Sequence, residues 1–202
     1  MNQGPITYSY WVIPEKVLAG EYPGNQIRKS GIFRVLRTIF DQFLSCSRYP
    51  FQGWPTDKKR VKRLLESGVT SFLDLTQYDE LLPYEELLNK ESKTFGIAVK
   101  YKRVPIKDQN ITSNEEITKC ILFINETVAS GEKVYIHCLR GLGRTGMIVG
   151  CFLVEQGMTG SYALEKIANL RKKLLNSALP SPQNKKQAGV VKNWRRISKS
   201  PK

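Results

Sequence analysis

A cysteine and an arginine separated by five residues are the most chemically informative pair in this sequence. Cys138 follows the apolar segment 134–136, and Arg144 precedes a second apolar segment, 147–154. Glycines punctuate the connection, which is typical of a tight loop that runs from a strand into a helix. Such a loop directs several backbone N–H groups at one point, where the helix dipole adds positive charge. The spacing therefore predicts an oxyanion-binding loop between a strand and a buried helix.

This loop could hold a phosphate group against a nucleophile. The guanidinium of Arg144 can form a bidentate, charge-assisted pair with two phosphate oxygens. Cys138 would lie at the base of the same loop, where the field that binds phosphate also stabilises a thiolate. A thiolate there can attack phosphorus, so the arrangement predicts hydrolysis of phosphate monoesters through a phosphocysteine intermediate. From the Cys138–Arg144 pair alone, the alternative interpretation is a buried cysteine in a glycine-rich turn that has only a structural role.

The string from His137 to Gly146 resembles the signature of the cysteine-dependent protein-tyrosine and dual-specificity phosphatases. The histidine, the cysteine-to-arginine spacing, the glycines and the hydroxyl of Thr145 all match. The resemblance implies that Cys138 is the nucleophile, that Arg144 binds the phosphate and that His137 orients the loop. It implies that Thr145 stabilises the departing thiolate, although a helix residue without a role is the alternative. The other loop residues that it places around the substrate are Leu139, Arg140, Gly141, Leu142 and Gly143.

A general acid must protonate the leaving group, and Asp108 is the candidate. It lies in a polar loop after the predicted strand 98–104, thirty residues before Cys138. If that strand is parallel to the strand before Cys138, both loops open at the same edge of the sheet. The position resembles the mobile acid loop of the family, but residues 111–113 lack the proline that many relatives carry there. A solvated loop aspartate is the alternative, and the weaker acid candidates are Asp79, Glu80 and Glu85.

Three further side chains could contribute to the site. The resemblance implies that Gln187, seven residues before Trp194 on the last predicted helix, binds substrate or positions the hydrolytic water. A plain surface glutamine is the alternative. Cys151 could form a disulfide with an oxidised Cys138, although a buried helical cysteine fits its apolar neighbours better. Asp74, inside a predicted strand, is expected to satisfy local backbone groups.

Strand-like and helix-like segments alternate along the chain. Strands are predicted at 8–13, 17–21, 71–75, 98–104 and 134–136. Helices are predicted at 56–68, 83–92, 113–131, 147–154, 161–175 and 181–197. This alternation predicts an α/β fold with a central, mostly parallel sheet flanked by helices, like that of dual-specificity phosphatases. We expect a single phosphatase domain over 1–202, with an extra helical insertion at 25–54 and a basic C-terminal helix and tail at 181–202.

The composition argues against several other kinds of site. His137 is the only histidine, and the four cysteines show no metal-binding spacing, so we expect neither a metal nor a cofactor. The cysteines are also too few and too scattered for a disulfide scaffold. No secretory signal is visible, and no apolar run approaches the ~20 residues that span a bilayer. We therefore expect a cytoplasmic monomer without a transmembrane segment, while export by a route that leaves no such signal stays open.

The charge of the chain indicates anionic partners. The formal net charge is +14, and the stretch 171–202 contains no Asp or Glu. This basic surface could contact anionic lipid or nucleic acid, or be simply solvated. The segment 25–54 reads as a basic amphipathic helix that either packs on the domain or docks on a membrane or partner.

We expect the substrate to be a phosphorylated protein, carrying phosphotyrosine and also phosphoserine or phosphothreonine. Arg140 adds a cation to the loop and should favour substrates with more than one negative group, so a phosphoinositide or another polyanionic phosphate is the first alternative. An RNA 5′-triphosphatase is a second, against which the Leu142–Gly143 context and Asp108 argue. A non-catalytic phosphate-binding adaptor would not need Cys138, Arg144 and Asp108 together.

Overall fold

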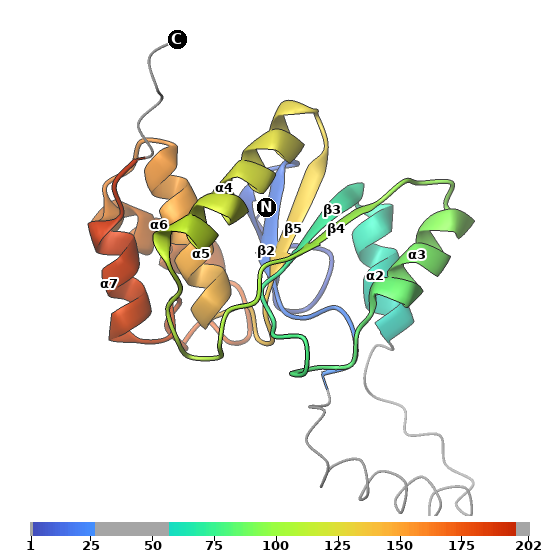
Figure 1. Cartoon of the computed structure of the whole chain (residues 1–202), viewed down its shortest axis with the longest axis horizontal. Helices are drawn as coiled ribbons and strands as arrows, with labels where there is room; N and C mark the ends of the chain where they lie inside the picture. Colours follow the sequence, from blue (N-terminus) through green and yellow to red (C-terminus); the bar gives the residue numbers. More distant parts are fainter. Residues whose placement is uncertain (1, 27–56, 197–202) are drawn as a thin grey trace, which may run out of the picture.

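The computed structural model describes residues 2–26 and 57–196, in which a five-stranded sheet lies between two layers of helices (Figure 1). The strands are β1 (Ser9–Ile13), β2 (Val17–Gly20), β3 (Val69–Asp74), β4 (Lys100–Arg103) and β5 (Lys133–His137). Their order in the sheet is β1-β2-β5-β3-β4. Only the pair of β1 and β2 is antiparallel within this sheet, which confirms the predicted mostly parallel sheet.

Helices cover both faces of the sheet (Figure 1). On one face lie α2 (Asp57–Glu66) and α3 (Glu85–Thr94). On the other face lie α4 (Asn114–Ala129), α5 (Gly143–Glu155), α6 (Gly160–Arg171) and α7 (Lys185–Asn193). Because successive side chains of a strand point to opposite faces, β5 contributes to two separate cores. Val134 and Ile136 pack with α4 to α7, whereas Tyr135 packs with α2 and α3.

Helix α5 is buried on all sides, as its apolar composition predicts. Every residue from Gly143 to Val154 is buried, because the sheet, α4, α6 and α7 surround this helix. The absence of a side chain at Gly150 allows α7 to approach closely, since a Cβ there would lie 2.5 Å from Val191. The helix that carries the first residues after the cysteine loop is thus fixed in position by packing.

Both boundaries of the last helix differ from the prediction. The last helix begins at Lys185 rather than at 181, because the side chain of Asn184 caps it by accepting the N–H of Gln187 at 3.0 Å. It ends at Asn193, and Trp194 instead donates its indole N–H to Glu155 at 2.7 Å. The predicted insertion at 25–54 lies outside the described residues except for its first two, and so do Thr56 and the tail from 197 onward.

Candidate active site

The loop from Cys138 to Leu142 leaves the central strand of the sheet and leads directly into α5. β5 lies between β2 and β3, so this loop emerges at the carboxyl edge of the sheet, where open α/β sheets bind their ligands. Gly141 has φ +68°, and a Cβ there would overlap the backbone of Gly20 at the end of β2. The loop can therefore take this close path only with glycine at 141.

The predicted nucleophile, acid and arginine line one pocket. The pocket has a volume of about 40 Å³, and Cys138 is 3% exposed within it. Its lining residues are Asp108, Gln109, Cys138, Leu139, Arg140, Gly143, Arg144 and Gln183. Three separate segments thus meet at one point: the loop after β4, the loop after β5 and the segment before α7. Gln183 was not predicted from the sequence, which places it inside the predicted helix 181–197, whereas the structure places it before α7.

Arg144 is held by two loops at this edge of the sheet. Its side chain is 1% exposed, and both terminal nitrogens donate to the carboxylate of Glu80, at 2.6 and 2.7 Å. Nη1 also donates to the carbonyl of Ile106 at 3.0 Å, and Nη2 lies 3.1 Å from Oδ1 of Asp108. The guanidinium is therefore fixed before any ligand binds, which lowers the entropic cost of binding a phosphate.

Glu80 contacts Arg144 rather than lining the pocket. It was a weaker candidate for the acid, but its carboxylate forms a two-point ion pair with Arg144. The signal available in the sequence was its position six residues after β3, in a loop that opens at the same edge as Cys138. The other two weaker candidates, Asp79 and Glu85, are exposed, and neither lines the pocket.

Asp108 reaches the pocket for the predicted reason. β4 is parallel to β3 and β3 is parallel to β5, so the loop after β4 opens beside the cysteine loop. The Asp108 side chain is 36% exposed, so it is open to solvent on one side and lies beside Arg144 on the other. This placement suits a group that must exchange protons with a leaving group and then with water.

The remaining predicted residues lie around the loop. Thr145 is buried in the first turn of α5, and its hydroxyl oxygen has no hydrogen-bond partner among the described residues. Arg140 is exposed at the rim of the pocket. Gln187 is buried and lies against Gly143, where a Cβ would come within 2.8 Å of its side-chain oxygen, but it does not line the pocket. Gln187 thus contacts a residue of the loop without being one of the pocket's lining residues.

Cys151 lies deeper in α5. The helical rise places it roughly 12 Å along the axis from the first residue of the helix, away from the pocket of Cys138. Burial raises the pKa of the Cys151 thiol to about 12. A protonated thiol at this depth is a poor partner for an oxidised Cys138, so the position favours the core role.

His137 and Asp74 form a buried polar network beneath the loop. Nε2 of His137 lies 2.7 Å from the hydroxyl oxygen of Tyr84. Asp74 accepts the backbone N–H of Thr76 at 2.8 Å, as expected for local satisfaction. It also forms an ion pair with Arg103 at 2.9 Å, which the sequence did not predict. Burial opposes ionisation of Asp74, but His137, Arg103 and hydrogen bonds outweigh it and lower the pKa.

We expect the stability of the folded chain to fall as the pH decreases from about 6.5 to 4. Burial lowers the pKa of His137 to about 4, although Asp74 acts in the opposite direction. The unfolded state, with a histidine pKa of about 6.5, therefore takes up a proton at a higher pH than the folded state does. His137 is the only histidine, so a single imidazole NMR signal should titrate near pH 4 in the folded chain. A midpoint near 6.5 would contradict this expectation.

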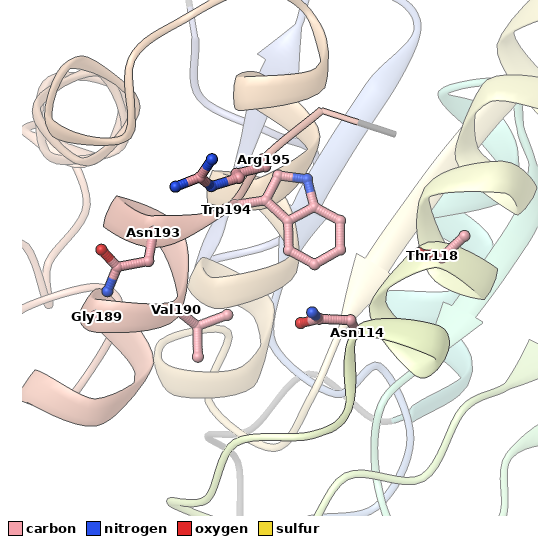
Figure 2. A pocket seen from close by; sticks show the side chains of 7 residues that line it. All are labelled: Asn114, Thr118, Gly189, Val190, Asn193, Trp194 and Arg195. Carbon is pink, nitrogen blue, oxygen red and sulfur yellow. The ribbon is translucent and has the colours of Figure 1, made fainter. Parts of the chain in front are cut away.

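A second, larger pocket lies between α4 and α7. It has a volume of about 570 Å³ and is lined by Asn114, Thr118, Gly189, Val190, Asn193, Trp194 and Arg195. Figure 2 shows the indole ring of Trp194 between α7 and the start of α4. Within the described residues, this pocket shares no lining residue with the pocket of Cys138.

Among residues 2–26 and 57–196, no group of three or more His, Cys, Asp or Glu side chains is arranged to hold a metal ion. None of the helices described is both long enough and apolar enough to cross a bilayer.

Comparison with known proteins points to one family. A sequence profile of the family described as "Polymorphic toxin system, DSP-PTPase phosphatase" matches residues 51–158. The putative tyrosine phosphatase 197R of Invertebrate iridescent virus 6 is 36% identical over 157 residues, which cover 73% of this chain and 51% of the viral protein. The phosphatidylglycerophosphate phosphatase PTPMT2 of Arabidopsis thaliana is 29% identical over 137 residues, covering 67% of this chain and 55% of that protein.

The fold agrees with these matches. A crystal structure of PTPMT1 in complex with PI(5)P superposes with a TM-score of 0.60 at 16% identity, covering 93% of this chain and 94% of that one. The chain spans about half the length of the curated relatives that it matches. Because a profile of the family covers more than half of the sequence and the sheet matches that of its structural relatives, this chain belongs to the DSP-PTPase family of cysteine-based phosphatases.

Proposed function

We propose that this chain hydrolyses phosphate monoesters on proteins, those of phosphotyrosine and also of phosphoserine and phosphothreonine, through a phosphocysteine intermediate. The observation that carries the proposal is the meeting of Cys138, Arg144 and Asp108 in one pocket. The 3.1 Å distance between Nη2 of Arg144 and Oδ1 of Asp108 supports it further. An arginine that binds phosphate and a carboxyl group that can give a proton lie together over a cysteine.

In the first step, the thiolate of Cys138 attacks phosphorus and forms the S–P bond. The P–O bond to the leaving group breaks, and Asp108 gives its proton to the leaving oxygen. The backbone N–H groups of the loop and Arg144 bind the three equatorial oxygens of the phosphoryl group. The substrate side chain then leaves as a neutral alcohol or phenol.

In the second step, water attacks the phosphocysteine and Asp108 accepts a proton from it. The S–P bond breaks, and the sulfur of Cys138 leaves as a thiolate with the bonding electron pair. The hydroxyl of Thr145, which lacks a hydrogen-bond partner among the described residues, can donate to that thiolate. This is the reason to keep Thr145 in the proposed site, while His137 orients the loop through Tyr84.

Replacement of Asp108 by asparagine tests the proposed acid. Asparagine has the same shape but no proton to give, so we expect turnover of alkyl and unactivated aryl phosphates to fall by about 10²–10⁴-fold. Turnover of 4-nitrophenyl phosphate should fall much less, because its leaving group needs little protonation. The measurement is kcat over a series of leaving groups in the presence of a chelator.

The matched control is Asp79→Asn, which removes an exposed carboxylate outside the pocket and should leave all rates unchanged. Equal losses for good and poor leaving groups would remove Asp108 from the role of acid. Loss of wild-type activity in the chelator would refute the metal-independent route.

A second candidate function keeps the chemistry and changes the substrate to a polyanionic phosphate. It is favoured by Arg140, an exposed cation at the rim of the pocket. The name of one relative, phosphatidylglycerophosphate phosphatase, points the same way. A comparison of kcat/KM for phosphotyrosine peptides, phosphoserine peptides and phosphatidylglycerophosphate in mixed micelles would distinguish the two candidates.

A further inference from the structure

The proposed acid lies in a strained turn. The carbonyl of Lys107 accepts the N–H of Asn110 at 3.0 Å, which makes Asp108 and Gln109 the two central residues of a tight turn. Gln109 has φ +59°. Turns with positive φ at the second central residue favour glycine or asparagine, because the Cβ of other residues is crowded there. A glutamine in this conformation persists only where surrounding contacts hold it.

Two amide side chains from the start of α7 supply such contacts. Nδ2 of Asn184 donates to the carbonyl of Gln109 at 2.9 Å. Nε2 of Gln187, which is buried, donates to the carbonyl of Asn110 at 3.0 Å. Both bonds therefore reach the backbone of the turn that carries Asp108, from residues that follow it by more than seventy positions.

The same segment also contacts the cysteine loop. The hydroxyl of Ser181 donates to the carbonyl of Leu142 at 2.9 Å. Gln187 lies against Gly143, and Gln183 lines the pocket. Residues 181–187 thus touch both loops that build the pocket and fix the distance between them.

We propose that Asn184 is a positioning residue that holds the turn 107–110, and with it the carboxyl group of Asp108, over Cys138. The inference rests on the function proposed above and adds a residue that acts through the acid loop without touching substrate. Gln187 is the second member of this contact, since its side chain donates to the carbonyl of Asn110 in the same turn and lies against Gly143 of the cysteine loop.

The test must separate this role from capping, because Oδ1 of Asn184 also caps α7. Serine and aspartate are good helix N-caps but carry no amide donor. Asn184→Ser and Asn184→Asp therefore keep the cap and lose the bond to Gln109. The matched control is Thr159→Ala, which removes the N-cap of α6 at an exposed position outside the pocket.

Two measurements are made on the full chain. The first is kcat for good and poor leaving groups. For both Asn184 variants, we expect kcat to fall by about 10-fold or more with poor leaving groups and to change little with 4-nitrophenyl phosphate. The second is hydrogen exchange of the Asn110 amide, which is protected by the carbonyl of Lys107. Exchange should become faster in the Asn184 variants and stay unchanged in Thr159→Ala.

Each contrary result has a clear meaning. Unchanged exchange in an active Asn184→Ser variant would overturn the role of Asn184 and leave the proposed function intact. Equal losses of kcat for good and poor leaving groups would also overturn it. Such a result would indicate a general structural defect, because misplacement of the acid alone should slow mainly the poor leaving groups. A wild-type chain that hydrolyses no phosphate monoester would instead refute the proposed function.

Discussion

Serine at position 138 should abolish turnover of every phosphate monoester by this chain, with a loss of at least roughly 10⁴-fold in kcat. The hydroxyl of serine is not ionised near neutral pH, and no histidine lies in the pocket to take its proton. Cys138 is almost fully buried and the two side chains have nearly the same shape, so the loop should fold normally. Binding of phosphate should therefore persist while hydrolysis stops.

The measurement pairs steady-state turnover with binding of inorganic phosphate to the same sample. The control is Cys120→Ser, the same change at a buried cysteine of α4 that does not line the pocket. It should reduce stability modestly and keep the activity. Substantial turnover by Cys138→Ser would mean that water attacks the substrate directly, and the phosphocysteine route would then be wrong.

Replacement of Arg144 by methionine should reduce both activity and stability. Activity should fall by about 10²–10³-fold or more, because the pocket loses its bidentate phosphate donor. The carboxylate of Glu80, which is 9% exposed, would lose both of its bonds to the guanidinium. Removal of one partner of a buried ion pair typically costs about 3–5 kcal/mol. Urea unfolding and kcat/KM measure the two effects.

Arg171→Met is the matched control for this change. Arg171 is equally buried, but it donates to the backbone carbonyls of Asn176 and Leu179, far from the loop in sequence and outside the pocket. Its loss should lower stability and leave kcat/KM close to that of the wild type. An Arg144→Met/Glu80→Met double variant should recover part of the stability and none of the activity. Recovery of activity would contradict the assignment of Arg144 to phosphate binding.

The sequence predicts those parts of the site that depend on local pattern or on parallel strands. The loop after β5 follows from glycines and a fixed spacing within a few residues, and Asp108 follows from the parallel pairing of β4, β3 and β5. Outside the site, Ser113 caps α4 by accepting the backbone N–H of Glu116, a serine-to-glutamate spacing that is typical of a helix start. Each of these features is specified by neighbouring residues in the sequence or by the rule that parallel strands end at the same edge of a sheet.

The contacts that the sequence did not reveal join distant loops. The pair of Glu80 and Arg144 spans 64 positions, and the bond from Asn184 to Gln109 spans 75. Neither partner carries a periodic pattern, and the geometry arises only after the loops have folded against each other. The bond from Gln187 to Asn110 was missed for the same reason, since the spacing to Trp194 specifies a helix face but not which loop that face meets.

The pairing of β2 with β5 has a consequence for how the chain is made. The backbone of Gly20, at the end of β2, packs closely against Gly141, and the backbone carbonyl of Leu139 accepts the N–H of Tyr22. These two pairs are 121 and 117 positions apart in the chain. At ribosomal elongation rates of about 5–20 residues per second, the first hairpin waits on the order of 10 s for β5 to emerge. During that interval the hairpin presents an unpaired edge to other nascent chains. Among the described strands β5 is the last to be synthesised, and it both completes the sheet and leads into the loop that carries Cys138.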